Sequence, residues 1–208
     1  MDVRPLFKEK RSKIGRRWVN PSFAMHRLFV ALRPPAPLRD ACLDAMDPGP
    51  AGWAWQDEEQ LHLTLRYIGE VERPVAEDIA AAMESLRAPA PSFHLAGVGH
   101  FDHGARSALF ARVEPREPLR LLHEKIDRLI VRCGLDPERR AFLPHITLAR
   151  KRRAAEAPTL WLEARAGLSS ASVMVSHLTL YESHLGKHGA SYEPIARYPL
   201  DPSPGGPI

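Results

Sequence analysis

The sequence has little cysteine and no long apolar stretch. Cys42 and Cys133 are its only cysteines, so neither a CxxC zinc site nor a disulfide framework is indicated. No apolar run approaches the roughly 20 residues that cross a membrane as a helix. We therefore expect a cytoplasmic protein that has no membrane partner and resides in a reducing compartment. Hydrophobic residues still make up 44% of the chain, enough for the core of one compact domain.

Most of the chain also lacks an excess of charge of either sign. The formal net charge is +4, but residues 1–25 carry seven Lys or Arg against two acidic residues, which leaves 22 basic and 23 acidic residues elsewhere. A near-neutral body excludes a duplex DNA binder with a wide basic face. Binding of a polyanion would need a local patch. The strongest candidate is the run Arg150-Lys151-Arg152-Arg153, although such runs more often form a solvated turn.

Composition divides the chain into three parts. Residues 1–24 are basic and lack hydrophobic periodicity, which predicts a disordered N-terminal extension. Residues 25–200 predict a single domain of two similar halves, and residues 201–208 (DPSPGGPI) predict a flexible tail.

Within the domain, helical and strand-like patterns are interspersed, which predicts an α+β fold. Apolar stripes at helical spacing predict helices near residues 38–46, 74–86 and 118–133. Strands are predicted at residues 27–33, 61–68, 92–101, 107–114, 145–150, 173–182 and 192–200.

A four-residue motif stands out because it occurs three times. HLTL occupies residues 62–65, HITL residues 145–148 and HLTL residues 177–180. The chain has ten histidines but only four threonines, and three of those threonines follow a histidine at a spacing of two. Chance does not explain this coincidence, although it does not follow that all three copies have one role. The first two copies lie 83 residues apart, one in each half, which suggests an internal duplication.

The alternation of a strand gives the motif a chemical meaning. Side chains two residues apart share one face, so His62 and Thr64 would face a cleft while Leu63 and Leu65 anchor the strand in a core. Two such strands would bring together two imidazoles and two hydroxyls. Histidine titrates near neutral pH, so one imidazole could accept a proton while the other donates one. Threonine hydroxyls could donate hydrogen bonds to phosphate oxygens, and this set suits acid–base cleavage of a phosphodiester without metal or cofactor.

A structural interpretation competes with this one. A single histidine on a strand is more often structural than catalytic, and threonine is simply a favourable strand residue. One motif alone would therefore favour the structural interpretation. Two copies in matching contexts favour the functional one.

Longer strings give the chain a family resemblance. RLFVALRPP, HLTLRYIG, LPHITLAR and LYESHLGKHGASYEPIARYPL occur in order between Met25 and Leu200. In these strings the chain resembles the 2H phosphoesterase superfamily, and within it the RNA 2′,3′-cyclic phosphodiesterases, also called 2′-5′ RNA ligases. The resemblance implies a bilobal α+β fold whose two pseudo-symmetric lobes have antiparallel sheets around a central cleft.

The resemblance also assigns candidate roles. It implies hydrolysis of an RNA 2′,3′-cyclic phosphate to a 2′-phosphomonoester, with His62 as proton donor and His145 as proton acceptor. The two motifs are near copies, so the residues alone do not distinguish these roles. Thr64, Thr147 and Arg150 would bind the phosphate. The third copy falls where the family needs no histidine, and Glu182 after it would repel phosphate, so we expect His177 to be structural.

Other candidates are weaker. Aromatic residues could stack on bases, but each is more often part of a core: Phe29, Tyr67, Phe101 and Tyr181. The His100–His103 segment resembles a metal site only faintly, and we expect no metal there. The expected partner is an RNA with a 2′,3′-cyclic phosphate end or a related nucleotide, bound by a monomer. Two alternatives remain: a hydrolase of small cyclic nucleotides or 2′-5′ oligonucleotides, and a binding module of the same fold without turnover.

Overall fold

The computed structural model describes Phe7 and residues 13–14, 17–18, 25–186 and 189–202. Most of the predicted N-terminal extension and of the predicted tail therefore lies outside the described residues. Two short strands pair before the main domain, β1 (Lys13–Ile14) and β2 (Arg17–Trp18).

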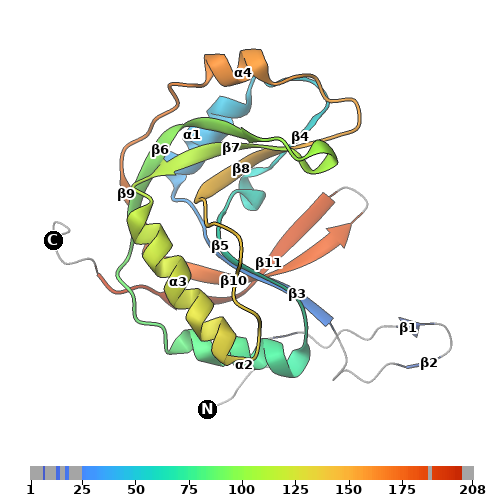
Figure 1. The fold of residues 1–208 in the computed structure, drawn as a ribbon, viewed down its shortest axis with the longest axis vertical. Coiled ribbons are helices and arrows are strands. Elements are labelled where there is room, and N and C mark those ends of the chain that lie inside the picture. Colours follow the sequence, from blue (N-terminus) through green and yellow to red (C-terminus); the bar gives the residue numbers. More distant parts are fainter. Residues whose placement is uncertain (1–6, 8–12, 15–16, 19–24, 187–188, 203–208) are drawn as a thin grey trace.

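The main domain is built on one curled antiparallel sheet (Figure 1). In the described part of the chain its nine strands include the path β11-β10-β3-β5-β8-β7-β6-β9, and β4 pairs with β8 beside that path. The strands are β3 (Met25–Leu32), β4 (Trp53–Trp55), β5 (Leu63–Glu72), β6 (Ser92–Phe101), β7 (Ala108–Glu114), β8 (His145–Lys151), β9 (Val173–Met174), β10 (His177–Gly186) and β11 (Gly189–Pro199).

Helices divide between the two halves of this sheet. In Figure 1, α2 (Arg73–Glu84) and α3 (Glu117–Arg132) cover the lower half, built of β3, β5, β10 and β11. The upper half holds α1 (Ala36–Met46) and α4 (Thr159–Ala164) with the remaining strands. Two short 3₁₀ helices complete the fold, η2 (Glu58–Gln60) and η3 (Gly104–Arg106). The α+β prediction is confirmed, and the sheets of the two lobes join at β5 and β8 into one.

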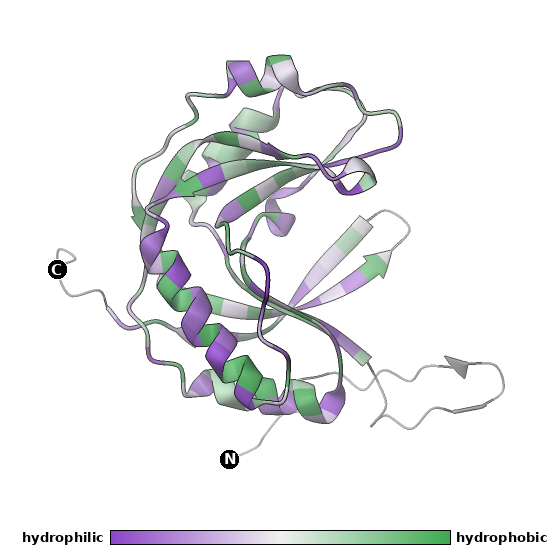
Figure 2. Ribbon diagram, viewed as in Figure 1, coloured by the Kyte–Doolittle hydropathy of each residue, from purple (hydrophilic) through white to green (hydrophobic). Residues whose placement is uncertain are grey.

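The core fixes which face of each strand is free. Leu63, Leu65, Leu178 and Leu180 are buried at 1% exposure or less, so the leucines of the motifs anchor their strands as expected. Helix α3 packs on this side, because the buried His123 ring is bonded through Nδ1 to the carbonyl oxygen of Leu65 at 2.6 Å. Figure 2 shows apolar and polar residues alternating along α3, as expected for a helix that buries one face. The opposite, concave face of the sheet remains for binding.

Most of the predicted elements are observed, and one is wrong. The predicted strand 173–182 is two strands that lie in different halves of the sheet: Val173 and Met174 pair with β6, whereas β10 pairs with β3 and β11. An unbroken apolar pattern cannot reveal that its two ends belong to different halves. Strand β4, helix α4 and η2 were not predicted from the sequence.

The N-terminal segment contributes to the core through Phe7. This side chain is fully buried, and its ring lies 4.7 Å from that of His26, measured between centroids. His26 is itself bonded through Nδ1 to Glu182 at 3.2 Å. Among the described residues, none of the helices combines the length and apolarity that crossing a membrane would require.

Candidate active site

The first two motif copies lie on neighbouring strands in the centre of the sheet. Strands β5 and β8 run antiparallel and pair through Leu63 and Ile146, both fully buried. On the concave face this register sets His62 opposite Thr147 and Thr64 opposite His145. Directly opposed side chains lie about 4.5–5.5 Å apart between Cβ atoms. The sheet therefore brings the two predicted His-Thr pairs together around a local two-fold axis.

Both motif strands carry a bulge at the same motif position. Between its pairings with Ala31 and Val30 of β3, strand β5 has one extra residue, Leu65. Strand β8 has the corresponding extra residue, Leu148, opposite β7. A bulge shifts the alternation by one residue, so the side chain three positions after each threonine returns to the concave face. Tyr67 and Arg150 are those side chains, and both line the same cavity as His62 and Thr64.

The third copy lacks this bulge. Along β3, strand β10 keeps an unbroken register through Thr179, Tyr181 and Glu182. Glu182 therefore points to the side opposite Thr179, where it is 4% exposed and contacts His26. The sequence-based argument that Glu182 would repel phosphate does not hold, because this carboxylate does not face the concave surface. The structure pairs His62 with His145 and leaves His177 at the far end of the same face.

One hydrogen bond orients each imidazole of the central pair. The Nδ1 atom of His62 lies 2.7 Å from the carbonyl oxygen of Gln60, and that of His145 lies 2.8 Å from the carbonyl oxygen of Leu143. A carbonyl can only accept, so Nδ1 carries a proton in both rings. In the neutral ring Nε2 can then accept a proton, and in the charged ring Nε2 can donate one. The Nδ1 atom of His177 instead meets the hydroxyl of Ser176 at 2.9 Å, which does not fix a tautomer.

The surroundings favour neutral imidazoles. Burial lowers the pKa of His62 to about 4, in spite of the opposing hydrogen bond to Gln60, and the charges of Arg150 and His145 lower it further. Burial also lowers the pKa of His145, again with a contribution from Arg150. Protonation of either ring in the free protein is therefore disfavoured at neutral pH, and a bound anion would oppose this effect.

The cavity beside His62 has a volume of about 440 Å³. Aromatic rings support both histidines: His62 lies 4.9 Å from Phe29 and 5.0 Å from Tyr192, and His145 lies 4.9 Å from Phe101, all between ring centroids. Tyr192 was not named as a site residue from the sequence, although the family-like string LYESHLGKHGASYEPIARYPL contains it. Of the proposed stacking residues, Tyr67 is 45% exposed in the cavity, whereas Phe29 and Tyr181 are buried.

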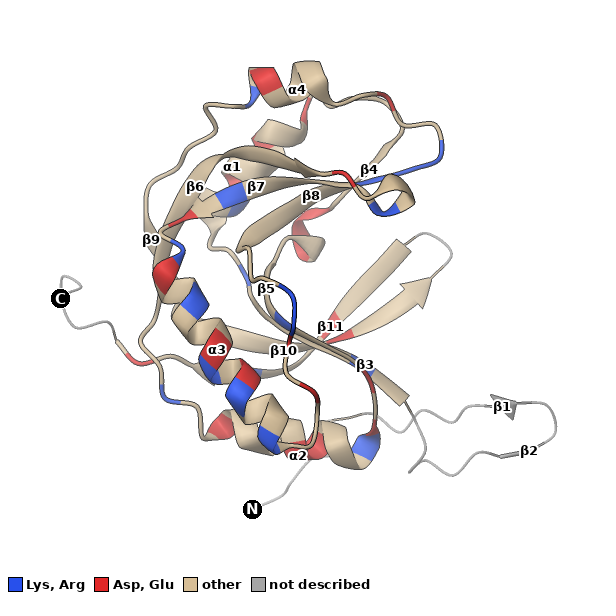
Figure 3. Cartoon of the chain, in the orientation of Figure 1, with Lys and Arg blue, Asp and Glu red and all other residues tan. Residues whose placement is uncertain are grey.

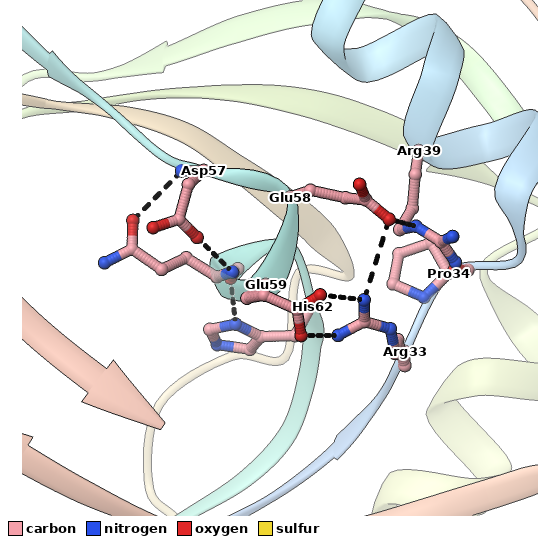
Figure 4. A network of polar contacts seen from close by, with 8 residues as sticks. Arg33, Pro34, Arg39, Asp57, Glu58, Glu59 and His62 are labelled. Atoms are coloured by element: carbon pink, nitrogen blue, oxygen red, sulfur yellow. Dashed lines mark hydrogen bonds and ion pairs between the residues drawn. The ribbon is translucent and has the colours of Figure 1, made fainter. Parts of the chain in front are cut away.

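A polar network holds the carbonyl group that orients His62 (Figure 4). Asp57 and Gln60 form a reciprocal capping box around η2, with bonds of 2.8 and 3.0 Å. Arg33 donates two bonds to Glu59, at 2.9 and 3.0 Å. The side chain of Gln60 also donates to the carbonyl oxygen of Ala190, which ties η2 to β11. The position of His62 thus depends on a short helix anchored to several strands.

The remaining candidates have structural places. Arg150 lines the cavity, whereas the rest of the basic run continues into the loop after β8, visible in Figure 3. His100 is partly buried and lies 5.7 Å from the ring of Trp53, between centroids. Within the ranges that the structure describes, no group of three or more His, Cys, Asp or Glu could hold a metal ion.

A site of this kind, with two His-x-Thr strands at the centre of a two-lobed α+β fold, defines a 2H phosphoesterase. Residues 50–187 match the family described as the 2′-5′ RNA ligase superfamily. The chain belongs to this superfamily, and the resemblance drawn from its motifs is confirmed.

Named relatives agree with this family. An RNA 2′,3′-cyclic phosphodiesterase of Aeropyrum pernix is 33% identical over 143 residues, which cover 67% of this chain and 81% of the relative. A second protein of that name, from Escherichia coli, is 29% identical over 84% of this chain and 96% of its own length. The crystal structure of E. coli LigT complexed with 3′-AMP is similar with a TM-score of 0.69 and 27% identity, over 85% of this chain and 99% of LigT.

Proposed function

We propose that this protein hydrolyses the 2′,3′-cyclic phosphate at the end of an RNA to a 2′-phosphomonoester, by acid–base catalysis between His62 and His145. The observation that carries the proposal is the pairing of β5 with β8. Through one residue pair, Leu63 and Ile146, this pairing places the two His-Thr pairs opposite each other. The names of the relatives from Aeropyrum pernix and E. coli support the same substrate class.

Each proton in this reaction has a defined route. A water oxygen attacks phosphorus while its proton passes to Nε2 of the neutral imidazole. The bond between phosphorus and the 3′ oxygen breaks, and Nε2 of the charged imidazole gives its proton to that oxygen. The Nδ1–H bonds to Gln60 and Leu143 keep both Nε2 atoms available for these transfers. Thr64, Thr147 and Arg150 bind the non-bridging phosphate oxygens, whose charge grows during attack.

The family resemblance assigns His62 as donor and His145 as acceptor. The lowered pKa of His62 means that this donor acquires its proton in the presence of the substrate, because the negative phosphate stabilises imidazolium. Substrates with a good 3′ leaving group test the assignment, since they need little proton donation. His62→Ala should then recover part of its activity and His145→Ala should not. The opposite pattern would exchange the roles.

A product analysis tests the proposed reaction itself. The protein is incubated with EDTA and a short RNA that carries a 2′,3′-cyclic phosphate, and the product is separated from authentic 2′- and 3′-phosphate standards. We expect full activity and only the 2′-phosphate. Loss of activity that a divalent ion restores would rule out the metal-free mechanism, and a 3′-phosphate would mean that the 2′ oxygen had left.

A further inference from the structure

A second cavity, of about 460 Å³, opens on the concave face beside the third motif copy. Its walls include His177 and Thr179 of β10 and Arg197 of β11, and it extends under η2 to Arg33. Tyr192 lines this cavity and also the catalytic one. Because the ring of Tyr192 lies 5.0 Å from that of His62, one aromatic side chain separates the two cavities.

The strand register places both cavities on one surface. Thr64 pairs with Ala31, Ala31 with Thr179, and Thr179 with Arg197, so these four residues form one row across four strands. Directly paired residues in a sheet point to the same face. Three strand spacings separate Thr64 from Arg197, or about 14 Å. A chain that leaves the catalytic centre along this row would cross the second cavity.

The second cavity has the chemistry of a site for a phosphorylated ligand. Three arginines line it, Arg33, Arg39 and Arg197, against the carboxylate of Glu59. Arg33 is bonded to Glu59, and Arg39 donates at 3.0 Å to Glu58. Arg197 is exposed and, within the described part of the chain, makes no side-chain hydrogen bond or ion pair. Its guanidinium group, with five donors, is thus open to phosphate oxygens.

The third motif supplies neutral donors to the same cavity. The hydroxyl of Ser176 lies 2.9 Å from Nδ1 of His177, and both residues line the wall. Thr179 is 4% exposed and forms part of the floor. Tyr192 adds an aromatic ring on which a base could stack, and the buried Tyr181 also lines the wall. Cations, hydroxyl groups and aromatic rings together match a nucleotide unit of single-stranded RNA.

We propose that this cavity, which we call the 177 pocket, binds a nucleotide upstream of the cyclic phosphate end, with Arg197 contacting its phosphate. This inference rests on the proposed function, since it assumes that the reacting end of an RNA lies between His62 and His145. It gives the third motif copy a role in substrate length: the first two copies act on the terminal phosphate, and the third holds the chain behind it.

Substrates of two lengths test the 177 pocket. The value of kcat/KM is measured for cytidine 2′,3′-cyclic phosphate and for a five-nucleotide RNA with the same end, and the ratio of the longer to the shorter substrate is compared. Arg197→Gln should lower this ratio roughly 1.5- to fivefold, mostly through KM, which is the range of an exposed charge contact. The slope of log binding constant against log salt for the longer RNA should also decrease by about 0.7, as expected for one lost phosphate contact.

Arg132→Gln is the matched control. It removes the same charge from an exposed position on α3, which packs on the other side of the sheet, and its ratio should equal that of the wild type. If Arg197→Gln leaves the ratio of the two kcat/KM values unchanged, whether or not both values fall, the proposed role of the 177 pocket is wrong.

A binding measurement separates this inference from the proposed function. Fluorescence anisotropy of a labelled five-nucleotide RNA ending in a 2′-phosphate needs no turnover. Binding that depends on Arg197, in a protein that hydrolyses neither substrate, would support the pocket and reject the proposed function. Hydrolysis of both substrates with no dependence on Arg197 would reject the pocket and support the function.

Discussion

At the scale of single residues, orientation distinguishes the two central histidines from the histidine of the third motif copy. The three copies of the motif are nearly identical in sequence. In the structure they differ in the bond partner of Nδ1 and in the neighbouring strand. The sequence, through its family resemblance, could select His62 and His145. It could not show that both rings are bound to a carbonyl two residues earlier, because a backbone conformation and not a residue type provides that bond.

Removal of either central imidazole should abolish most of the turnover. General acid or base catalysis contributes about 10²–10⁴-fold, and we expect losses of that size in kcat for His62→Ala and His145→Ala. Thr64→Ala and Thr147→Ala should lose less, because each removes one hydrogen bond and no proton transfer. Steady-state kinetics on a mononucleotide cyclic phosphate measure these losses. His94→Ala, on β6, serves as the control, and a similar loss there would indicate general damage to the fold.

The lowered histidine pKa values predict the pH dependence. One ring must be charged and one neutral, and burial lowers both pKa values below the usual 6.5. The free protein therefore gains the productive form as pH falls toward the acid side of 6.5, and loses it again when both rings are charged. We expect a bell-shaped kcat/KM profile with its optimum below pH 6.5, defined by macroscopic values of the pair. In the complex, phosphate raises the pKa of imidazolium, so the basic limb of kcat should lie at higher pH.

Arg150 should affect both binding and titration. Its charge contributes to the lowered pKa of His62 and of His145, so Arg150→Gln should move the basic limb of kcat/KM to higher pH while KM increases. Proton NMR titration of the imidazole signals checks the direction independently of turnover. Arg152→Gln, which changes the next arginine of the basic run, should leave the titration as in the wild type. A shift toward acid in Arg150→Gln would contradict the electrostatic argument.

At the scale of elements, the bulges at Leu65 and Leu148 determine the composition of the site. Strict alternation from His145 would turn Arg150 away from the cleft, yet it lines the cavity because β8 contains one extra residue. The sequence predicted most strands because their apolar patterns are local. It could not predict a bulge, which depends on the register with a neighbouring strand, nor that residues 173–182 form two strands in different halves of the sheet.

The short helix η2 should be the element whose stability controls His62. Asp57→Ala removes the capping bond to the backbone N–H of Gln60, and N-cap losses of this kind cost about 0.5–2 kcal/mol. Looser placement of the Gln60 carbonyl should lower kcat more than it raises KM. Urea unfolding measures the loss of stability, and steady-state kinetics measure the changes in kcat and KM. Asp44→Ala, an exposed change on α1, is the control, and an unaltered kcat in Asp57→Ala would mean that η2 does not position the ring.

At the scale of the whole molecule, the buried Phe7 connects the N-terminal segment to the core of the domain. The buried ring of Phe7 packs on His26. A chain that starts at Met25 would lack this ring and would leave the side chain of His26 exposed to water. We expect this truncated chain to hydrolyse short substrates but to melt at a lower temperature. Phe7→Ala should cost about 3–5 kcal/mol. Thermal melting measures both changes, and Leu160→Ala, at an 80% exposed position, should have little effect.

The local two-fold axis between Leu63 and Ile146 has a consequence for the direction of the reaction. By microscopic reversibility, the donor of the forward step is the acceptor of the return step, and the symmetric setting of the two rings provides each histidine with the same Nδ1–H anchor for both. Closure of a 2′-phosphate back to the ring would therefore use the same two side chains in exchanged roles. Attack of another hydroxyl on the cyclic phosphate would use them in the roles proposed for hydrolysis, with that hydroxyl in place of water. Nothing in the pair itself favours cleavage over joining; the concentrations of water and of the competing hydroxyl decide.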